Sequence, residues 1–440
     1  MVGKAAPSLI IGAPASGSGK TTLTLAILRA LHRRGRSVSS YKIGPDYIDP
    51  VFHRRASDHT CYNIDPWAMS PETITSIFFK VLNNKDIAIG EGVMGLFDGA
   101  QNGRGSTADV AVAHDIPIVL VVDAKGQAAS VAALLTGYNT YREDVSIAGV
   151  IFNKVGGPGH VRLLREATEK VGIPMLGCVP KSDLLALDHR HLGLIQAREK
   201  PELENFLDAA ADIISNHVDL SALGNLARPV SNITENPLKT LTPIGQHTAI
   251  ADDDAFSFIY PHILEGWKNA GAAFSFFSPL DNQAPSIEAD AIFLPGGYPE
   301  LHCEKLTKNA EFKNAMTAAA AKGAIIYGEC GGFMTLGEYL IDKEGRQHQM
   351  LGLLPVTTSF AKPKLHLGYR NARLQQDNFL GPRNTQFKAH EFHYAHMTNT
   401  SAQSALFDIS DARDENLGTV GAIYGNVAGS FIHLIDKART

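Results

Sequence analysis

Short apolar runs alternate with helix-forming stretches along the first half of the chain. The stretch at 22–35, TLTLAILRALHRRG, places its apolar residues at helical spacing. Strands separated by helices predict right-handed βαβ units around a parallel sheet, an α/β fold. The predicted strands are SLIIGA at 8–13, VSSYKIG at 38–44, DIAIGEG at 86–92, IPIVLVVDA at 116–124, IAGVIFNKV at 147–155 and IPMLGCV at 173–179.

The alternation stops after the helical stretch at 202–218 and resumes near residue 248. Residues 227–247 are rich in Pro, Asn and Thr without apolar periodicity, which is typical of a linker. TAIADD, AIFLPGG, KGAIIYGECGG and FIHLID then predict a second α/β sheet. We expect a first domain at 1–226, a linker at 227–247 and a second domain at 248–440.

Composition narrows the functional classes. The chain has 440 residues, which favours two domains, and a net charge of -5 with scattered basic residues, which argues against a nucleic-acid-binding protein. The four cysteines form no CxxC pair, and we find no run of eighteen apolar residues. We therefore expect a cytoplasmic protein with no membrane span and with small molecules as partners.

GAPASGSGKTT at 12–22 has the features of a phosphate-binding loop. It follows an apolar strand and precedes a helix, so small residues let backbone N–H groups converge on phosphate oxygens. We expect Lys20 to reach the terminal phosphates and Thr21 to offer a hydroxyl to Mg²⁺. The nucleotide-binding candidates in this loop are Gly17, Gly19, Lys20, Thr21 and Thr22.

Carboxylates at two other strand ends complete this predicted site. Asp46 and Asp49 follow one strand, and Glu91 ends another. Hard oxygen ligands beside a phosphate loop suit Mg²⁺, so Asp46 and Glu91 join Thr21 as metal candidates, against the alternative of solvated loop carboxylates. Asn153 is either a reader of an adenine edge or a simple turn residue.

GECGG at 328–332 fits a tight strand-to-helix turn that exposes a nucleophile, with the helix N-terminus favouring the thiolate. Cys330 is the candidate nucleophile, and the alternative is a buried structural cysteine. His433, on a strand-like stretch, is the candidate base. Gly297, after another strand, and Gly331 are candidate donors of N–H groups to an oxyanion.

Three histidine-containing stretches have several interpretations. HEFHY contains His390 and His393, but no fixed-spacing ligand set accompanies them, so substrate contact or packing is favoured over a metal site. HRR at 53–55 and DHRH at 188–191 are either solvated faces or contacts to a polycarboxylate substrate.

The chain as a whole resembles the glutamine-dependent cobyrinic acid a,c-diamide synthase family of corrinoid biosynthesis. The first half is similar to the dethiobiotin-synthetase branch of P-loop ATPases, and the second half to class I glutamine amidotransferases. The motifs that carry the resemblance are APASGSGKTT, KIGPDYIDPVFH, NIDPWAM, EGVMGLFDG, NKVGG, RHLGL, PGGYPE, GECGGFM, HEFHY and GSFIHL.

The resemblance implies an ATP-dependent amide ligase with ATP and L-glutamine as co-substrates and Mg²⁺ as cofactor. Glutamine would be hydrolysed at Cys330 through a thioester, and ammonia would be carried internally to the ATP site. There the a and c acetate carboxylates of the macrocycle would be activated as acyl phosphates and amidated. A homodimer is left open.

One position departs from ordinary class I amidotransferases, which carry a glutamate two residues after the histidine. Here that position is Ile435, and Asp436 would point to the other face of a strand. The resemblance therefore implies a Cys330–His433 dyad and leaves open which group orients the imidazole.

Three readings compete at the level of substrate and class. The amino-terminal motifs favour metal-free hydrogenobyrinic acid over cobalt-containing cobyrinic acid. A cobyric acid synthase would amidate four other side chains. A ParA-like partitioning ATPase would carry a lysine where Ala15 stands and would have no cysteine turn.

Overall fold

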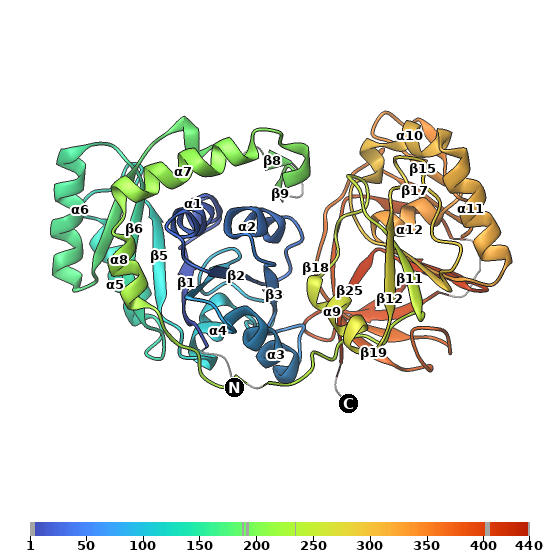
Figure 1. Ribbon diagram of the computed structural model, residues 1–440, viewed down its shortest axis with the longest axis horizontal. Helices are drawn as coiled ribbons and strands as arrows, with labels where there is room; N and C mark the ends of the chain where they lie inside the picture. Colours follow the sequence, from blue (N-terminus) through green and yellow to red (C-terminus); the bar gives the residue numbers. More distant parts are fainter. Residues whose placement is uncertain (1–4, 187–188, 191–192, 234, 401–404, 439–440) are drawn as a thin grey trace. The chain divides into compact units, whose positions relative to one another are not determined.

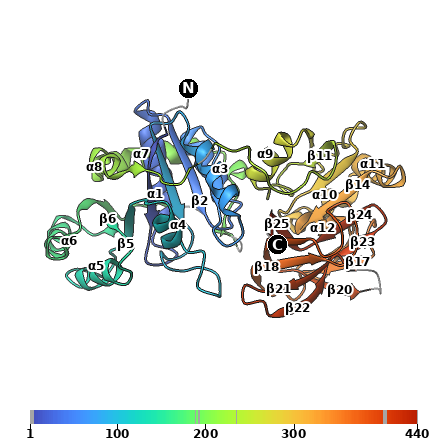
Figure 2. The same cartoon turned by 90° about the horizontal axis from the view of Figure 1, so that it is seen from below.

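The computed structural model describes the backbone of residues 5–186, 189–190, 193–233, 235–400 and 405–438, with side chains described for these except 189–190, 193–194 and 399–400. The chain folds into two compact units (Figures 1 and 2). Unit 1 comprises Met1–Trp67 and Pro71–Asn236, and unit 2 comprises Ala68–Ser70 and Pro237–Thr440.

Unit 1 is built on a parallel sheet in the order β3-β2-β4-β1-β5-β6-β7, with short β10 (Arg228–Pro229) antiparallel to β1. This confirms the predicted parallel α/β fold. The parallel strands are β1 (Pro7–Gly12), β2 (Val38–Ile43), β3 (Tyr62–Ile64), β4 (Ile87–Gly92), β5 (Ile118–Asp123), β6 (Ile147–Val155) and β7 (Met175–Pro180). A two-residue pair, β8 (His189–Arg190) and β9 (Gly193–Leu194), is antiparallel.

Helices cover both faces of this sheet. In Figure 1, α1, α2 and α7 lie together on one side, and α3 and α4 lie on the other. The helices are α1 (Lys20–Arg33), α2 (Asp49–Ser57), α3 (Pro71–Leu82), α4 (Thr107–Ala113), α5 (Val131–Thr140), α6 (Pro158–Val171), α7 (Leu203–His217) and α8 (Leu220–Leu226), with 3₁₀ turns η1 (Asp183–Leu185) and η2 (Ala197–Glu199).

The strand sequences explain where the polar residues gather. β1, β4 and β5 are almost continuous apolar runs because both faces of a parallel sheet are covered. Polar side chains are therefore concentrated at the carboxyl ends of the strands, where ligands bind in open α/β sheets. In the register, Glu91 of β4 lies opposite Ile11 of β1 and Lys42 of β2.

Unit 2 has a central sheet in the order β12-β11-β13-β14-β24-β23, parallel except for β23 at its edge. It confirms the second predicted α/β region. Its strands are β11 (His247–Ala251), β12 (Ala273–Phe277), β13 (Ala291–Leu294), β14 (Ile325–Glu329), β23 (Ala422–Tyr424) and β24 (Val427–Ser430). Its helices are α9 (Pro261–Asn269), α10 (Cys303–Lys308), α11 (Ala310–Ala321) and α12 (Gly331–Leu336), with the 3₁₀ turn η3 (Pro299–Leu301).

Two further sheets in unit 2 were not predicted. One has the order β16-β15-β17-β20, and the other is antiparallel with the order β22-β21-β18-β19-β25. FIHLID was predicted to continue the α/β sheet, but it forms β25 of the antiparallel sheet, because β25 pairs with β19 rather than with β24. The strands are β15 (Tyr339–Ile341), β16 (Gln347–Gln349), β17 (Val356–Ser359), β18 (His366–Leu374), β19 (Gln386–His393), β20 (His396–Thr400), β21 (Phe407–Ser410), β22 (Asn416–Val420) and β25 (Ile432–Lys437).

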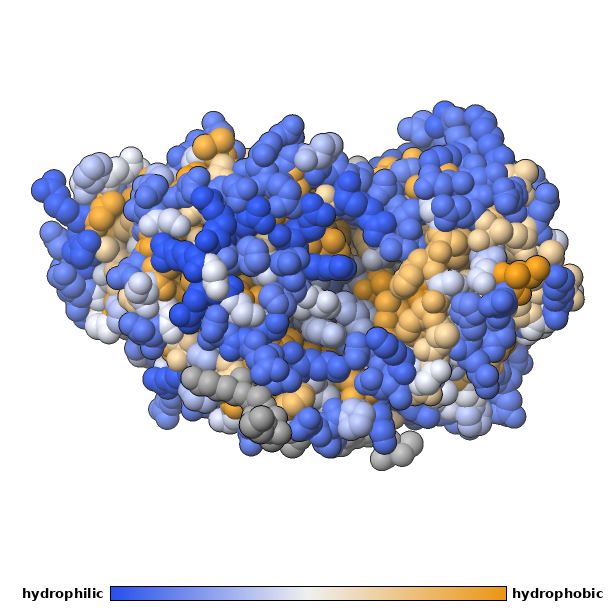
Figure 3. Space-filling model, viewed as in Figure 1, coloured by the Kyte–Doolittle hydropathy of each residue, from blue (hydrophilic) through white to orange (hydrophobic). Residues whose placement is uncertain are grey.

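The surface differs from unit to unit. On the face in Figure 3, polar and charged side chains cover most of unit 1, and a band of less polar residues crosses unit 2. The core of unit 2 is an apolar cluster that includes Phe256, Phe333 and Phe431 and also contains Cys330. Among the described residues, none of the helices combines the length and apolarity that crossing a bilayer requires.

Candidate active sites

The glycine-rich loop of unit 1 connects β1 to α1 and opens onto a cavity of ≈ 510 Å³. Gly17 has φ +79° and Gly19 has φ +94°, left-handed conformations that glycine adopts without steric cost. All the nucleotide and metal candidates predicted from the sequence line this cavity: Gly17, Gly19, Lys20, Thr21, Thr22, Asp46, Glu91 and Asn153. A volume of this size suits a small-molecule site.

Lys20 is the first residue of α1 and is 7% exposed. Its ammonium group donates to the backbone carbonyl of Met94. Burial lowers the pKa of Lys20 to about 8, and the charge of Lys42 lowers it further, while Glu91 opposes both. The ammonium ion is therefore the main form near neutral pH.

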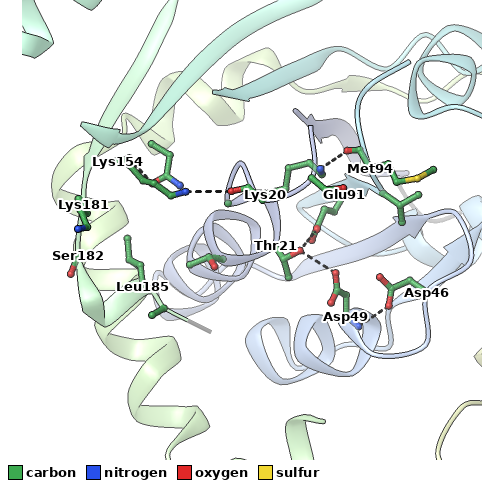
Figure 4. A pocket seen from close by; sticks show the side chains of 18 of the residues that line it. Lys20, Thr21, Asp46, Asp49, Glu91, Met94, Lys154, Lys181, Ser182 and Leu185 are labelled. Atoms are coloured by element: carbon green, nitrogen blue, oxygen red, sulfur yellow. Dashed lines mark hydrogen bonds between the residues drawn. The ribbon is translucent and has the colours of Figure 1, made fainter. Parts of the chain in front are cut away.

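Oxygen ligands converge beside Lys20. Thr21 Oγ1 donates to Glu91 Oε1 at 2.6 Å and lies 3.0 Å from Asp49 Oδ2. Figure 4 shows these three side chains pointing toward one another in the cavity. The ammonium of Lys42 lies 2.6 Å from Asp49 Oδ2 and 2.7 Å from Glu91 Oε1, so a cation already stands between the two carboxylates.

Asp46 lies slightly apart from this group. Its Oδ1 accepts from the backbone N–H groups of Ile48 and Asp49 at 2.9 and 3.0 Å, at the start of α2, and its Oδ2 is 3.6 Å from Lys42 Nζ. Burial and the neighbouring Asp49 raise the pKa of Asp46 to about 6. Asp46 thus both shapes the turn and faces the cavity.

His53 of α2 is fully buried, with Nε2 2.6 Å from Glu91 Oε2. Burial alone would lower the pKa of His53, but Cys61 and Glu91 raise it to about 10. Burial would raise the pKa of Glu91, yet Lys42 and His53 hold it well below its usual value. Glu91 is therefore a permanent anion fixed on both oxygens.

The solvated-face interpretation of HRR fits Arg54 and Arg55, which are exposed, and is wrong for His53, which is fully buried. Arg55 is about half exposed and pairs with Glu204 of α7 at 2.7 Å. DHRH at 188–191 lies outside the residues whose side chains the structure describes.

Asn153 lies at the far end of the loop. Its amide donates to the carbonyl of Ser18 at 3.0 Å and accepts from the N–H of Lys154 at 2.9 Å. A Cβ on Gly19 would overlap the Asn153 amide, so glycine is needed there. The cavity continues past Asn153 and Lys154 along residues 180–183 and 185–186 after β7.

In unit 2, Cys330 stands between β14 and α12 with φ 47° and ψ -103°, a strained conformation for a residue with a side chain. Three glycines allow this turn, since a Cβ on Gly328, Gly331 or Gly332 would overlap neighbouring atoms. The N–H of Cys330 is fixed by the carbonyl of Ser430 at 2.8 Å. These features match the predicted nucleophile turn.

The His433 ring lies beside Cys330. A Cβ on Gly296 would overlap Cε1 of His433, and it would lie 3.2 Å from Nε2 of His433 and 3.3 Å from the Cβ of Cys330. His433 is 1% exposed and sits on β25. Gly296, Cys330 and His433 therefore meet at one point, although the chain separates them widely.

The predicted oxyanion donors are also close together. A Cβ on Gly331 would lie 3.0 Å from the backbone N of Gly297. Gly332, next to Gly331, is already engaged, because its N–H donates to the carbonyl of Pro295 at 3.0 Å. The turn before η3 and the start of α12 thus bring two glycine backbones to the thiol.

The electrostatics of Cys330 differ from the expected stabilised thiolate. Burial raises the pKa of Cys330 above its ordinary value, and the carboxylate of Glu300 raises it further. Only the N–H of Gly331 is found to oppose this among the causes identified in the described chain. The N-terminus of the six-residue helix α12 stabilises the thiolate too little to offset the effect of burial on the pKa of Cys330. The thiol therefore needs a base to lose its proton.

HEFHY forms the end of β19. His390 lies opposite His433 in the register, and burial lowers the pKa of His390 to about 3. His393 is 2.7 Å from Glu391 Oε1 and stacks on His366 with ring centroids 4.8 Å apart and planes 4° apart. Among the described residues, His366, Glu391 and His393 bring their potential ligand atoms within 4.8 Å of one another, as the ligands of a metal ion would be.

The geometry of this group disfavours a metal ion. Imidazole lone pairs lie in the ring plane, so two parallel stacked rings do not point at one ion. The other oxygen of Glu391 is held by Arg370 at 2.7 Å, which places a cation at the site already. Packing of His393 against Phe431, 4.0 Å between centroids, fits a structural role.

Two family models match the chain. Residues 9–194 match the CobQ/CobB/MinD/ParA nucleotide binding domain, and residues 247–440 match the CobB/CobQ-like glutamine amidotransferase domain. A protein of Brucella abortus biovar 1 (strain 9-941), named hydrogenobyrinate a,c-diamide synthase, is 50% identical over 429 residues, 97% of this chain and 98% of the relative.

Proteins of the same name from Rhizobium meliloti (strain 1021) and Mesorhizobium japonicum are 48% and 46% identical. These alignments cover 97% and 98% of this chain, respectively, and 99% of each relative. The chain belongs to the hydrogenobyrinate a,c-diamide synthase family. The resemblance inferred from the motifs is thereby confirmed, as is the class of ATP-dependent amide ligase with glutamine as nitrogen donor.

The structure brings residues into the two candidate sites that the sequence did not single out. Lys42 is 2% exposed in a fully buried strand, and a lysine there needs counter-charges, which was a usable signal. No local pattern pointed to the segment at 180–183 and 185–186, which lines the unit 1 cavity. None pointed to Glu329 either, whose carboxylate lies 3.6 Å from His433 Nδ1. Their places follow from the tertiary fold.

Proposed function

We propose that this protein amidates the a and c carboxylates of hydrogenobyrinate, using ATP and ammonia from glutamine. The observation that carries the proposal is the 50% identity, over 97% of the chain, to a relative named for that reaction. The two candidate sites support it, because each supplies one of the two chemistries that such a ligase needs.

The glutaminase chemistry would take place at Cys330. His433 accepts the thiol proton as the sulfur attacks the amide carbon, and then gives that proton to the departing ammonia. The N–H groups of Gly297 and Gly331 receive the oxyanion of the tetrahedral intermediate. Water then hydrolyses the thioester and releases glutamate. The raised pKa of Cys330 supports proton transfer during attack rather than a resting thiolate.

The synthetase chemistry would take place in the unit 1 cavity. The loop N–H groups and Lys20 bind the triphosphate and orient its γ-phosphoryl group toward the substrate carboxylate. Transfer of that group gives an acyl phosphate, and ammonia displaces phosphate to leave the amide. A free carboxylate offers no comparable leaving group, which is why ATP is consumed.

The donor atoms around Thr21 fit Mg²⁺. They are oxygens, two of them from carboxylates, and they line the same cavity as the phosphate-binding loop. We assign Thr21, Glu91 and Asp49 as the residues that would hold Mg²⁺. The predicted ligand Asp46 lies farther from Thr21, next to Lys42, and is a weaker candidate. Bound Mg²⁺ would neutralise charge on the phosphate oxygens.

The names of the relatives support hydrogenobyrinate over cobyrinate as substrate. Cobyric acid synthase remains the second candidate because the amidotransferase model covers both types of enzyme. A cytoplasmic location, where ATP and glutamine are abundant, and a homodimer belong to the same proposal. Analytical ultracentrifugation of the purified protein tests the homodimer.

The proposal is tested with purified protein, ATP, Mg²⁺ and glutamine, supplied with either macrocycle. Mass spectrometry should count two amidations, faster on hydrogenobyrinate than on cobyrinate. Four amidations would favour cobyric acid synthase, and an equal or reversed preference would overturn the substrate assignment.

Two variants separate the half-reactions. Cys330→Ser should lose glutamine-dependent amidation and keep the reaction with free ammonia, whereas the matched buried variant Cys303→Ser should keep both. Lys20→Ala should lose both, since the phosphates then lack their ammonium partner. Glutamine-dependent turnover by Cys330→Ser would refute the assignment of the nucleophile.

A further inference from the structure

A carboxylate lies beside the His433 ring, and it comes from an unexpected element. Glu329 Oε2 is 3.6 Å from His433 Nδ1, and the side chains are 6% and 1% exposed. Glu329 is the last residue of β14 and directly precedes Cys330. The candidate nucleophile and this carboxylate are thus consecutive in the chain, while His433 arrives on β25.

The positions that could replace Glu329 are occupied otherwise. Ile435, two residues after His433, is a fully buried apolar side chain. Asp436 accepts from the N–H groups of Ser70 and Lys437 at 3.0 and 2.8 Å. The expectation that alternation turns Asp436 to the other face is wrong, because the pairing of β25 with β19 has a bulge that sets Asp436 opposite Lys388, two residues from His390, the partner of His433. Asp436 is occupied by its two N–H contacts and not excluded by its face of the strand.

Glu329 is held in place by the strand that carries the histidine. Its Oε1 accepts from the backbone N–H of Leu434 at 3.1 Å, the residue next to His433. The second oxygen, Oε2, is thereby left on the side of the imidazole. A carboxylate fixed through one oxygen has little freedom to rotate, so the other oxygen defines the direction of the ring.

The reaction supplies the reason for a charge at this place. His433 becomes an imidazolium when it takes the thiol proton, and a buried cation needs a nearby anion. A neutral ring with its proton on Nδ1, facing Glu329, keeps the Nε2 lone pair available to accept the thiol proton. At 3.6 Å the contact is an ion-pair distance and longer than a hydrogen bond, and catalytic contacts are often long before substrate is bound.

We propose that Glu329 is the positioning residue of the glutaminase site: it holds His433 in the tautomer with Nδ1–H and stabilises its imidazolium. This inference rests on the proposed function of Cys330 and His433. It differs from the class I pattern in that the carboxylate comes from the nucleophile strand and not from the histidine strand.

The test compares Glu329→Gln with Asp436→Asn in the full chain. Glutamine keeps the shape and the acceptor for Leu434 but removes the charge. We expect kcat for glutamine hydrolysis to fall about 10- to 100-fold in Glu329→Gln at an unchanged KM. Amidation with free ammonia should stay at the level of the unmodified protein. Asp436→Asn removes a charge from the histidine strand and should leave kcat unchanged.

A spectroscopic measurement separates positioning from a structural effect. In protein with ¹⁵N-labelled histidine, the His433 signal, assigned by its loss in His433→Asn, should report Nδ1–H in the unmodified chain and a mixture of tautomers in Glu329→Gln. If Glu329→Gln does not fold, Glu329→Asp keeps the charge and should show an intermediate kcat at unchanged KM.

The outcomes are distinguishable. No glutamine hydrolysis by the unmodified protein would sink the proposed function itself. Normal hydrolysis by the unmodified protein together with an unaltered kcat and tautomer in Glu329→Gln would sink only the role of Glu329. A raised KM at constant kcat would make Glu329 a glutamine-binding residue and would equally overturn the inference.

Discussion

The Nε2 atom of His53 lies 2.6 Å from Oε2 of Glu91, and both side chains are fully buried. His53 contacts Oε2 of Glu91, whereas Thr21 and Lys42 contact Oε1, so both oxygens of the carboxylate are fixed. Removing one partner of a buried charged pair leaves the other without compensation, which is more costly than losing an exposed ion pair.

His53→Ala should therefore lower the rate of ammonia-dependent amidation by about 10-fold or more, as expected for a loss of about 1–3 kcal/mol at a buried partner. ATP-independent glutamine hydrolysis should not change, because it takes place in unit 2. His53→Gln keeps a donor and should recover part of the rate. An Ala variant as active as the unmodified protein would show that Lys42 alone holds Glu91.

Lys20 should give the nucleotide site a dependence on alkaline pH. Its pKa of about 8 means that it is charged below that pH and becomes neutral above it. The value of kcat/KM for ATP should fall as pH rises through about 8, since the free enzyme then loses its phosphate partner. A profile measured from pH 6.5 to 9.5 checks this. A flat profile would mean that Lys20 keeps its proton throughout.

Asp46 and Asp49 should differ in their effect on Mg²⁺. Asp49 contacts Thr21 directly, whereas an asparagine at position 46 retains an oxygen for the two N–H groups of the turn. Asp49→Asn should raise the Mg²⁺ concentration for half-maximal amidation by about 10-fold or more, and Asp46→Asn should raise it less. The reverse order, in a Mg²⁺ titration of ammonia-dependent activity, would restore Asp46 as the main ligand.

Gly296 should tolerate no side chain. A Cβ there would displace the His433 ring, and a shift of about 1 Å at a catalytic base costs on the order of 100-fold in rate. Gly296→Ala should lose glutamine hydrolysis and keep ammonia-dependent amidation. Gly137→Ala, in a helix with open space around it, is the matched control and should keep both activities. Full glutaminase activity in Gly296→Ala would contradict the contact.

The sequence predicted the parts of each site that are local in the chain. The strand, glycine turn and helix around Lys20 are contiguous, and so are those around Cys330, so a single stretch specifies both shape and chemistry. His433 was found as a candidate because a histidine stood on an apolar strand. Its sheet was assigned wrongly, since alternation alone does not say which strand becomes the neighbour.

The parts that were missed depend on register and on contacts between distant segments. Lys42 and Glu91 meet because β2 and β4 pair in one register, which no local pattern encodes. Glu329 was not singled out, because its approach to His433 requires β25 to pass the end of β14. Such relationships belong to the folded chain and not to any motif.

The placement of His433 on an antiparallel sheet, with Cys330 at the end of a parallel one, has a mechanical consequence. The two sheets have separate hydrogen-bond networks, and they must keep a fixed position relative to each other for the sulfur of Cys330 to meet the imidazole of His433. A shift of one sheet against the other would separate the sulfur from the imidazole while leaving the hydrogen bonds within each sheet intact, so glutamine cleavage depends on how firmly the two sheets pack together.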